Sequence, residues 1–213
     1  MINQLNMADV KRHYDRRVRC HERLLILLND NRQQDYLNLA LGITESQGNY
    51  SASEHHLGER ILANNNPVPI VNLARSFLEQ ENRMHMLRSI HNANLPYLAI
   101  SVGSEMAMML RPDFFWVGNV RTIWTHLLHR HSYNLTHANE ELRLYREQNR
   151  EQNRTSEMEY LVWRDIYPRM QNSIENMCEI ANDVAINQGV ISGSSEYLWF
   201  DAIASSLYER FAN

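Results

Sequence analysis

The sequence predicts an all-α protein, either a multi-helix bundle or a stacked-helix array of about eight or nine helices. Apolar residues recur three and four positions apart along nearly the whole chain, and no stretch shows the strict alternation of a half-buried strand. Short segments rich in Asn, Pro and Gly separate the periodic stretches. The chain has 213 residues, of which 44% are hydrophobic, and this is enough to bury a core without disulfides.

The breaks in the first part of the chain define its helices. Gly42 is placed to end one helix, and Ser51 followed by Glu54 has the spacing of a capping box that begins another. The run 64–69 contains two prolines and is the clearest interruption, and a proline at this place suits the first turn of the next helix. The expected helices run from about Ala8 to Leu28, Gln33 to Leu41, Ser51 to Asn64 and Ile70 to His91.

Similar signals continue to the end of the chain. Pro96 and Pro112 each mark a turn, Ser156 with Glu159 forms a second capping-box pattern, and Pro168 is expected to kink the helix that contains it. The expected helices run from about Tyr97 to Leu110, from the turn at 111–113 to His131, from Thr136 into the tandem repeat 147–154, from Ser156 to Asn187, and from Glu196 to Phe211.

The connections are too short to separate independent domains. We therefore expect a single all-α domain over residues 1–213, with possible weak sub-boundaries near 64–69 and 149–156.

Composition excludes several classes of protein. The formal net charge of -4 and the ordinary hydrophobic content argue against disorder. No apolar run approaches the roughly 18–20 residues that span a bilayer. The first twelve residues lack the apolar core of a secretion signal, so we expect a protein of the cytoplasm, or of a virion if it is viral. Cys20 and Cys178 provide neither a disulfide framework nor a zinc site, and we expect no cofactor.

One short motif could carry chemistry. Arg121 is followed five residues later by His126 within a predicted helix, a spacing that resembles the motif of HEPN-type ribonucleases. That resemblance implies metal-independent RNA cleavage across a dimer, in which His126 moves a proton and Arg121 holds the phosphate. The resemblance covers about six residues, and Thr122 stands where that family usually has Asn, Asp or His.

Histidines gather after this motif. His126 and His129 lie one helical turn apart, and His131 and His137 follow, with Glu140 and Glu141 close behind. No third and fourth ligand can be placed with them, so the sequence predicts a solvated helix end and no metal site. Signatures of known enzymes, such as a glycine-rich phosphate loop or a nucleophile elbow, are missing.

Arginine is concentrated on the first predicted helix. Lys11 is the only lysine among the 21 basic residues of the chain, and arginine is the basic residue enriched in protein interfaces. A basic helix face is suited to a nucleic acid or to an acidic partner, and the acidic residues that interleave it favour protein contact or weak RNA contact. The candidate contact residues are Arg12, Arg16, Arg17, Arg19 and Arg23.

Three functions are compatible with these features. The first is a non-enzymatic, self-assembling or scaffold-type structural protein, such as a viral or phage coat or nucleocapsid-like subunit, or a cellular equivalent. The second is the HEPN-type ribonuclease using Arg121 and His126, and the third is a helical adaptor for a protein partner. The expected partners are copies of the same chain, other protein subunits and, weakly, RNA. Where the inward face of a helix cannot bury them, aromatic residues would anchor the interface, and the candidates are Trp116, Trp124, Trp163, Trp199 and Phe200.

Overall fold

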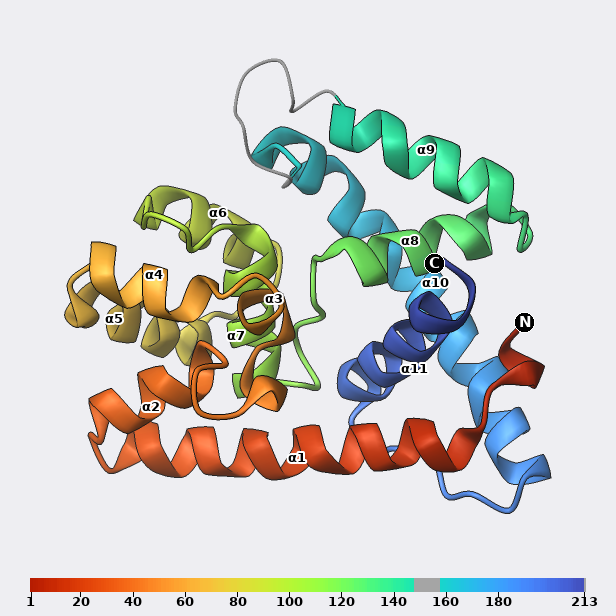
Figure 1. The fold of residues 1–213 in the computed structure, drawn as a ribbon, viewed down its shortest axis with the longest axis horizontal. Helices are drawn as coiled ribbons and strands as arrows, with labels where there is room; N and C mark the ends of the chain where they lie inside the picture. Colours follow the sequence, from red (N-terminus) through yellow and green to blue (C-terminus); the bar gives the residue numbers. More distant parts are fainter. Residues whose placement is uncertain (148–157, 213) are drawn as a thin grey trace. The chain divides into compact units, whose positions relative to one another are not determined.

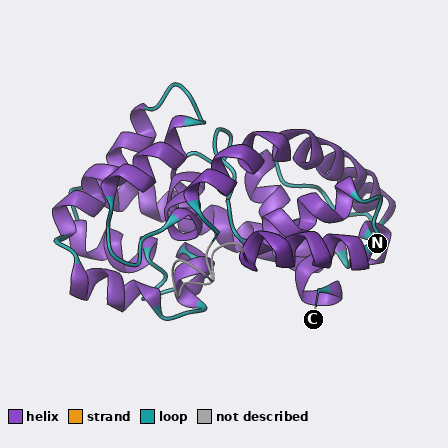
Figure 2. Ribbon diagram, turned by 90° about the horizontal axis from the view of Figure 1, so that it is seen from above, coloured by secondary structure: helices purple, strands orange, loops and turns teal. Residues whose placement is uncertain are grey.

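A computed structural model describes residues 1–147 and 158–212 of the chain. In that part it contains eleven α-helices and two short 3-10 helices, and it contains no strand (Figure 2). The predicted all-α class is confirmed. The number of helices exceeds the expected eight or nine because two of the expected helices are each divided into two.

Within residues 1–147 the helices follow one another through loops of at most nine residues, and α10 and α11 are joined by a loop of eight (Figure 1). The two 3-10 helices are η1 (Ile2–Gln4) and η2 (Ser46–Gly48). The α-helices are α1 (Met7–Asn29), α2 (Gln33–Ala40), α3 (Tyr50–Ser53), α4 (Leu57–Asn64), α5 (Pro67–Glu79), α6 (His85–Ala93), α7 (Ile100–Leu110), α8 (Val120–Arg130), α9 (Leu135–Glu147), α10 (Tyr160–Asn187) and α11 (Glu196–Phe211).

The chain forms two compact units. The terminal unit consists of residues 1–14 and 118–213, and the central unit consists of residues 15–117. Helix α1 contributes its first two turns to the terminal unit and the rest to the central unit. The sub-boundary expected near 64–69 instead connects α4 to α5 inside the central unit, and the one expected near 149–156 lies outside the described residues.

Helix α7 is the centre of the central unit. It packs against α3, α5 and α6 (Figure 1). Every residue of α7 except Ser101 is buried. Apart from Ser101, Ser104 and Glu105, its residues are apolar or glycine, so almost all of its surface has to be covered by other helices. Gly103 makes this covering possible, because a Cβ at this position would lie 2.8 Å from the side chain of Ile90 on α6.

Helix α8 has the equivalent position in the terminal unit. It packs against α9, α10 and α11, and its residues from Thr122 to Leu128 are buried. Two indoles of this core have satisfied N–H groups, since Trp124 donates to Asn139 Oδ1 at 2.6 Å and Trp199 donates to Asn182 Oδ1 at 2.9 Å. The side chains of Trp124 and Trp199 therefore contribute apolar area to the core while their polar edges are paired.

The helix expected over 51–64 is two helices, α3 and α4. Ser51 does not form the capping box that its spacing to Glu54 predicts. Asn49 is the residue that caps α3, and its Oδ1 accepts from the N–H of Ala52 at 3.0 Å. The hydroxyl of Ser51 instead donates to Glu105 at 2.7 Å. His56, at φ 49°, is in the left-handed region and separates α3 from α4.

The helix expected over 70–91 is also divided. Helix α5 begins at Pro67, where Asn66 Oδ1 accepts from the N–H of Val68 at 2.9 Å, and it ends at Glu79. The side chain of Arg111 donates to backbone carbonyls at the end of α5, with a distance of 2.5 Å to the carbonyl of Gln80. This distant arginine satisfies the carbonyl groups that an ended helix leaves open.

The remaining differences concern helix ends. Helix α8 begins at Val120 and not near 113, because Asn119 and Thr122 form a capping box there. Helix α10 begins at Tyr160 and contains Pro168, while the capping residue expected at Ser156 lies outside the described residues. The final helix spans Glu196–Phe211 as predicted.

Candidate functional site

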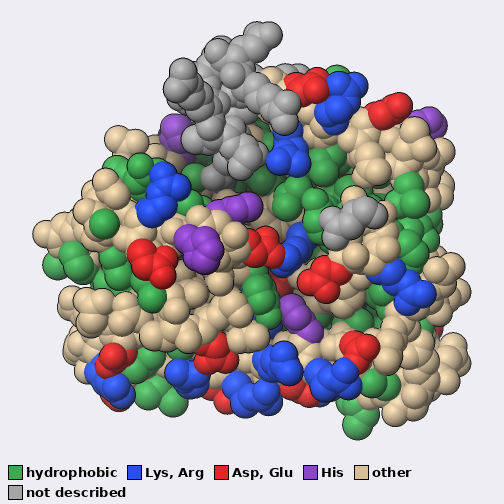
Figure 3. Space-filling view, viewed as in Figure 1, with side chains coloured by type: hydrophobic (Ala, Val, Ile, Leu, Met, Phe, Trp, Pro, Cys, Tyr) green, Lys and Arg blue, Asp and Glu red, His purple; other side chains and the backbone are tan. Residues whose placement is uncertain are grey.

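The arginines of α1 have two different environments. Arg12, Arg16, Arg19 and Arg23 are exposed, and their spacing of four, three and four residues places them along one face of the helix. Figure 3 shows basic and acidic side chains side by side over α1. Arg12 belongs to the terminal unit and pairs with Asp9. We call the three exposed arginines of the central unit, Arg16, Arg19 and Arg23, the arginine stripe.

Arg17 is not available for contact with a partner, which corrects the prediction for this residue. Its side chain is fully buried and forms an ion pair of 2.6 Å with Glu105, whose side chain is 1% exposed. It also donates to the carbonyl of Gln47 at 2.8 Å, and its guanidinium lies 4.9 Å from the ring centre of Tyr50. Arg17 lies seven residues from both Val10 and Leu24, so it falls on the inward face of α1.

Glu105 is the residue that the sequence analysis missed in this network. One carboxylate oxygen accepts from Arg17 and from the N–H of Tyr50 at 2.8 Å, and the other accepts from the N–H and the hydroxyl of Ser51 at 2.9 and 2.7 Å. All of these donors satisfy a charge that burial would otherwise make costly. The signal was a single acidic residue in the apolar run 100–110. The arrangement is a structural joint between α1, α3 and α7.

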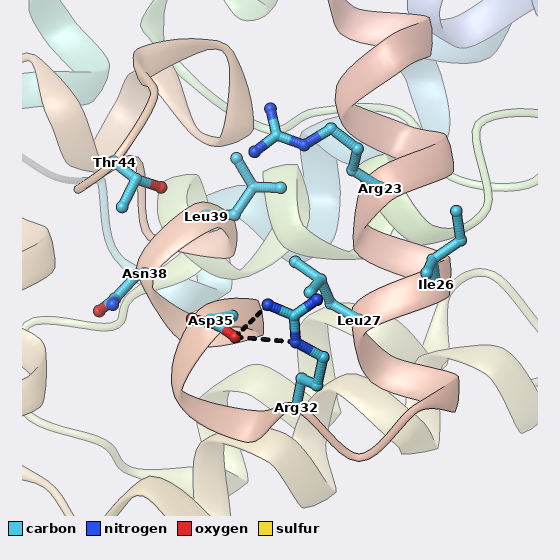
Figure 4. Close-up of a pocket in the computed structure, with 8 residues that line it drawn as sticks. All are labelled: Arg23, Ile26, Leu27, Arg32, Asp35, Asn38, Leu39 and Thr44. Atoms are coloured by element: carbon cyan, nitrogen blue, oxygen red, sulfur yellow. Dashed lines mark hydrogen bonds and ion pairs between the residues drawn. The ribbon is translucent and has the colours of Figure 1, made fainter.

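A surface pocket of about 310 Å³ lies between α1 and α2 (Figure 4). Its charged lining residues are Arg23, Arg32 and Asp35. Arg32 pairs with Asp35 at 2.7 Å, and Arg23 pairs with Glu45 at 2.5 Å. Its apolar lining comes from three side chains, and one of them, Ile26, is 57% exposed. The lining residues are Arg23, Ile26, Leu27, Arg32, Asp35, Asn38, Leu39 and Thr44. The pocket therefore lies at the C-terminal end of the arginine stripe and offers apolar atoms beside cations.

His126 lies in the core of the terminal unit. It is 5% exposed, and its Nδ1 is 2.8 Å from the hydroxyl of Ser173 on α10. Burial, assisted by the charge of Arg130, lowers the pKa of His126 to about 4. Its imidazole is consequently neutral at pH 7 and shielded from solvent.

Arg121 lies at the start of the same helix, just after the capping residue Asn119, and is half-buried. Five helical residues rotate the two side chains about 140° apart around the axis of α8. A histidine that transfers protons to and from RNA needs access to the substrate and a pKa near the working pH. Within one copy of the chain, the environment of His126 supplies neither, so the ribonuclease alternative has only the motif in its favour.

Of the histidines after this motif, His131 lies against an acidic side chain, and its ring also contacts that of His137. His131 Nε2 lies 2.6 Å from Glu141, which also pairs with Arg130 at 2.7 Å and accepts a hydrogen bond from Tyr145. Burial raises the pKa of Glu141, but the hydrogen bonds from Tyr145 and His131 and the charge of Arg130 outweigh it and leave the pKa lowered. Within residues 1–147 and 158–212, no three His, Cys, Asp or Glu side chains are arranged to hold a metal ion.

The aromatic residues predicted as interface anchors are all core residues. Each is at most 2% exposed, so none is available as an exposed anchor: Trp116, Trp124, Trp163, Trp199 and Phe200. Trp116, Trp124, Trp199 and Phe200 lie within runs of buried residues, whereas Trp163 lies on the inward side of α10 with Ile166, Tyr167 and Met170. Exposed aliphatic side chains are found instead, above all Ile186 at 69% and Ile191 at 85%.

The part of the chain that the structure covers has no helix both long and apolar enough to cross a membrane. Comparisons of the chain with protein-family models, with curated proteins and with solved structures find no match.

Proposed function

We propose that this chain is a non-enzymatic, self-assembling or scaffold-type structural protein. The observation that carries the proposal is the arginine stripe together with Ile26 and the adjoining pocket. Arg16 and Arg19 form no ion pair within the described residues, and Ile26 extends the same helix face by one turn. Arginine beside an exposed aliphatic group is typical of protein interfaces, where arginine also contributes much of the binding energy.

The surface charge favours a protein partner over a nucleic acid. Asp15 and Glu22 flank the stripe, and the whole chain carries a formal net charge of -4. A nucleic acid would be repelled by these carboxylates, whereas a partner protein can place its own charges between them. We therefore assign RNA at most a weak contact. The proposal covers two kinds of protein: a coat or nucleocapsid-like subunit of a virion, and a scaffold protein of the cytoplasm.

Light scattering behind a sizing column tests the proposal, with the 260/280 nm absorbance ratio recorded across the peak. We expect a mass above the 25.1 kDa of one chain, increasing with loading concentration, and the absorbance ratio of pure protein. A mass of one chain at every concentration would overturn the proposal. If the oligomer shows the absorbance ratio of bound nucleic acid, the chain assembles, but the arginine stripe contacts RNA and not protein.

A further inference from the structure

A second charged face, of opposite sign, lies on the C-terminal half of α10. Glu175, Glu179 and Asp183 are exposed and follow one another at intervals of four residues, so they lie along one side of the helix. Glu175 accepts a hydrogen bond from Gln171 at 2.9 Å, and none of the three forms an ion pair in the part of the chain that the structure describes. We call these three residues the acidic stripe.

An exposed isoleucine ends this face as well. Ile186 lies three residues beyond Asp183 and eleven beyond Glu175, which returns it to the same side of α10. Leaving a branched aliphatic side chain in water forgoes the favourable free energy of burying it. A partner that covers this side of α10 therefore binds more tightly by burying the side chain of Ile186.

The two stripes match in length and in order. From Arg16 to Ile26 is ten residues and from Glu175 to Ile186 is eleven, so they span about 15 and about 16.5 Å of helix. Both have their charges toward the N-terminal end and their isoleucine toward the C-terminal end. Parallel alignment places each cation beside an anion and Ile26 beside Ile186, whereas antiparallel alignment places each isoleucine beside charges.

We propose that the arginine stripe of α1 in one copy of this chain docks in parallel against the acidic stripe of α10 in a second copy. The central pair is Arg19 with Glu179, and Arg16 meets Glu175 while Arg23 meets Asp183. The proposal rests on the proposed self-assembly and names the two surfaces that perform it. Because the two surfaces differ, the contact can occur twice about a two-fold axis in a dimer, or it can continue from copy to copy as a heterologous contact.

Ile186 of the second copy enters the pocket between α1 and α2. That pocket lies at the Ile26 end of the arginine stripe, has a volume of about 310 Å³ and includes Leu27 and Leu39 in its lining. An aliphatic side chain in such a pocket excludes water from the nearby ion pairs and strengthens them. Arg23, which pairs with Glu45 at an exposed site, can exchange that partner for Asp183 at little cost.

Charge reversal gives a test that also controls for folding. Arg19→Glu and Glu179→Arg each place like charges opposite one another when the variant meets its own copies, and each is expected to weaken association about tenfold or more. When the two variants are mixed, the carboxylate introduced at position 19 of one lies opposite the guanidinium introduced at position 179 of the other. The unchanged Arg19 and the unchanged Glu179 also remain able to pair. The mixture should therefore associate at close to wild-type strength, as measured by sedimentation velocity.

Matched controls separate this contact from a general effect of charge. Arg88→Glu and Glu209→Arg change the net charge by the same amounts at exposed positions outside both stripes, and they should associate like wild type. If wild type assembles and neither reversal weakens it, or if the mixture is no stronger than the separate variants, the docking proposal is wrong while the proposed function stands. A wild-type chain that never assembles overturns both.

The isoleucine arm of the test compares two exposed residues of the same type. Ile186→Ser should weaken association about tenfold, because it removes the side chain that fills the pocket. Ile191→Ser changes the more exposed isoleucine, which lies in the loop after α10 and outside the acidic stripe. It should leave association unchanged, and equal effects of the two substitutions would overturn the placement of Ile186.

Discussion

Arg17 on α1 and Glu105 on α7 form an ion pair of 2.6 Å with both side chains shielded from water. The pair lies inside the central unit; Glu105 also accepts from the N–H groups of Tyr50 and Ser51 and from the Ser51 hydroxyl, and Arg17 also donates to the carbonyl of Gln47. A buried charge is tolerable only when it is paired and hydrogen-bonded. Of the five arginines predicted to meet a partner, this one instead determines how α1 is attached to the helices around α7.

Removing one member of this pair should destabilise the protein strongly. Arg17→Met leaves the Glu105 carboxylate buried without its cation, which typically costs about 3 to 5 kcal/mol of unfolding free energy. Urea denaturation followed by circular dichroism measures the change. The matched control Arg16→Met alters the exposed neighbour and should change stability by less than about 0.5 kcal/mol. Equal effects of the two substitutions would show that the buried pair is not formed.

His126 should make stability depend on pH. Its pKa is lowered from 6.5 to about 4 in the fold, so the unfolded chain binds the proton more readily than the folded chain does. The resulting contribution to stability is complete above pH 6.5 and is lost as the pH falls toward 4, and it amounts to about 3 kcal/mol. Unfolding free energies measured from about pH 7 to about pH 4 should therefore fall.

His126→Asn removes this titrating group while retaining a polar side chain that can meet Ser173. The variant should show a flatter pH dependence than wild type over the same interval. His55→Asn, at an exposed position, serves as the control and should retain the wild-type slope. A His126→Asn slope identical to that of wild type would place the pH dependence elsewhere.

The ribonuclease alternative makes a separate prediction about RNA. Because the imidazole of His126 is buried against Ser173, we expect wild type to leave a labelled single-stranded RNA intact. Incubation in the presence of a chelator, followed by a denaturing gel, is the measurement. Cleavage by wild type that disappears in both Arg121→Ala and His126→Ala variants, with circular dichroism unchanged, would establish the alternative function.

Both cysteines should be inert in the folded protein. Cys20 and Cys178 are buried and free. Burial, together with the nearby Glu45, raises the pKa of Cys20 to about 11, and burial with Glu196 raises the pKa of Cys178 to about 12. Thiolate is the reactive form, so a thiol reagent at about pH 8 should label neither cysteine until denaturant is added. Rapid labelling of the native protein would contradict their burial.

Helical periodicity was sufficient to predict the fold class and several complete helices. The first helix was expected within one residue of α1 at each end, and the final helix coincides with α11. Periodicity did not predict that two of the expected helices are each divided into two. The break at His56 depends on a left-handed backbone conformation, and the end of α5 depends on Arg111, which is distant in sequence. Such tertiary partners leave no periodic signal in the local sequence.

The candidate surface was only partly readable from the sequence. The density of arginine on the first helix identified the region. Arg17 lies three or seven residues from the apolar residues Val10, Tyr14 and Leu24, and this spacing places it on the inward face of the helix. The burial of the tryptophans was not readable from the sequence, because it is decided by which helices cover one another. The match between the arginine and acidic stripes required knowing that both helix faces are exposed.

Self-association of the wild-type chain is the central claim, and sedimentation velocity over a series of protein concentrations tests it most directly. At about 0.05 M salt we expect a sedimentation coefficient that rises with protein concentration, and at about 0.5 M salt a weaker rise, because salt screens the contacts between the stripes. A single species of 25.1 kDa at every concentration and at both salt concentrations would contradict it.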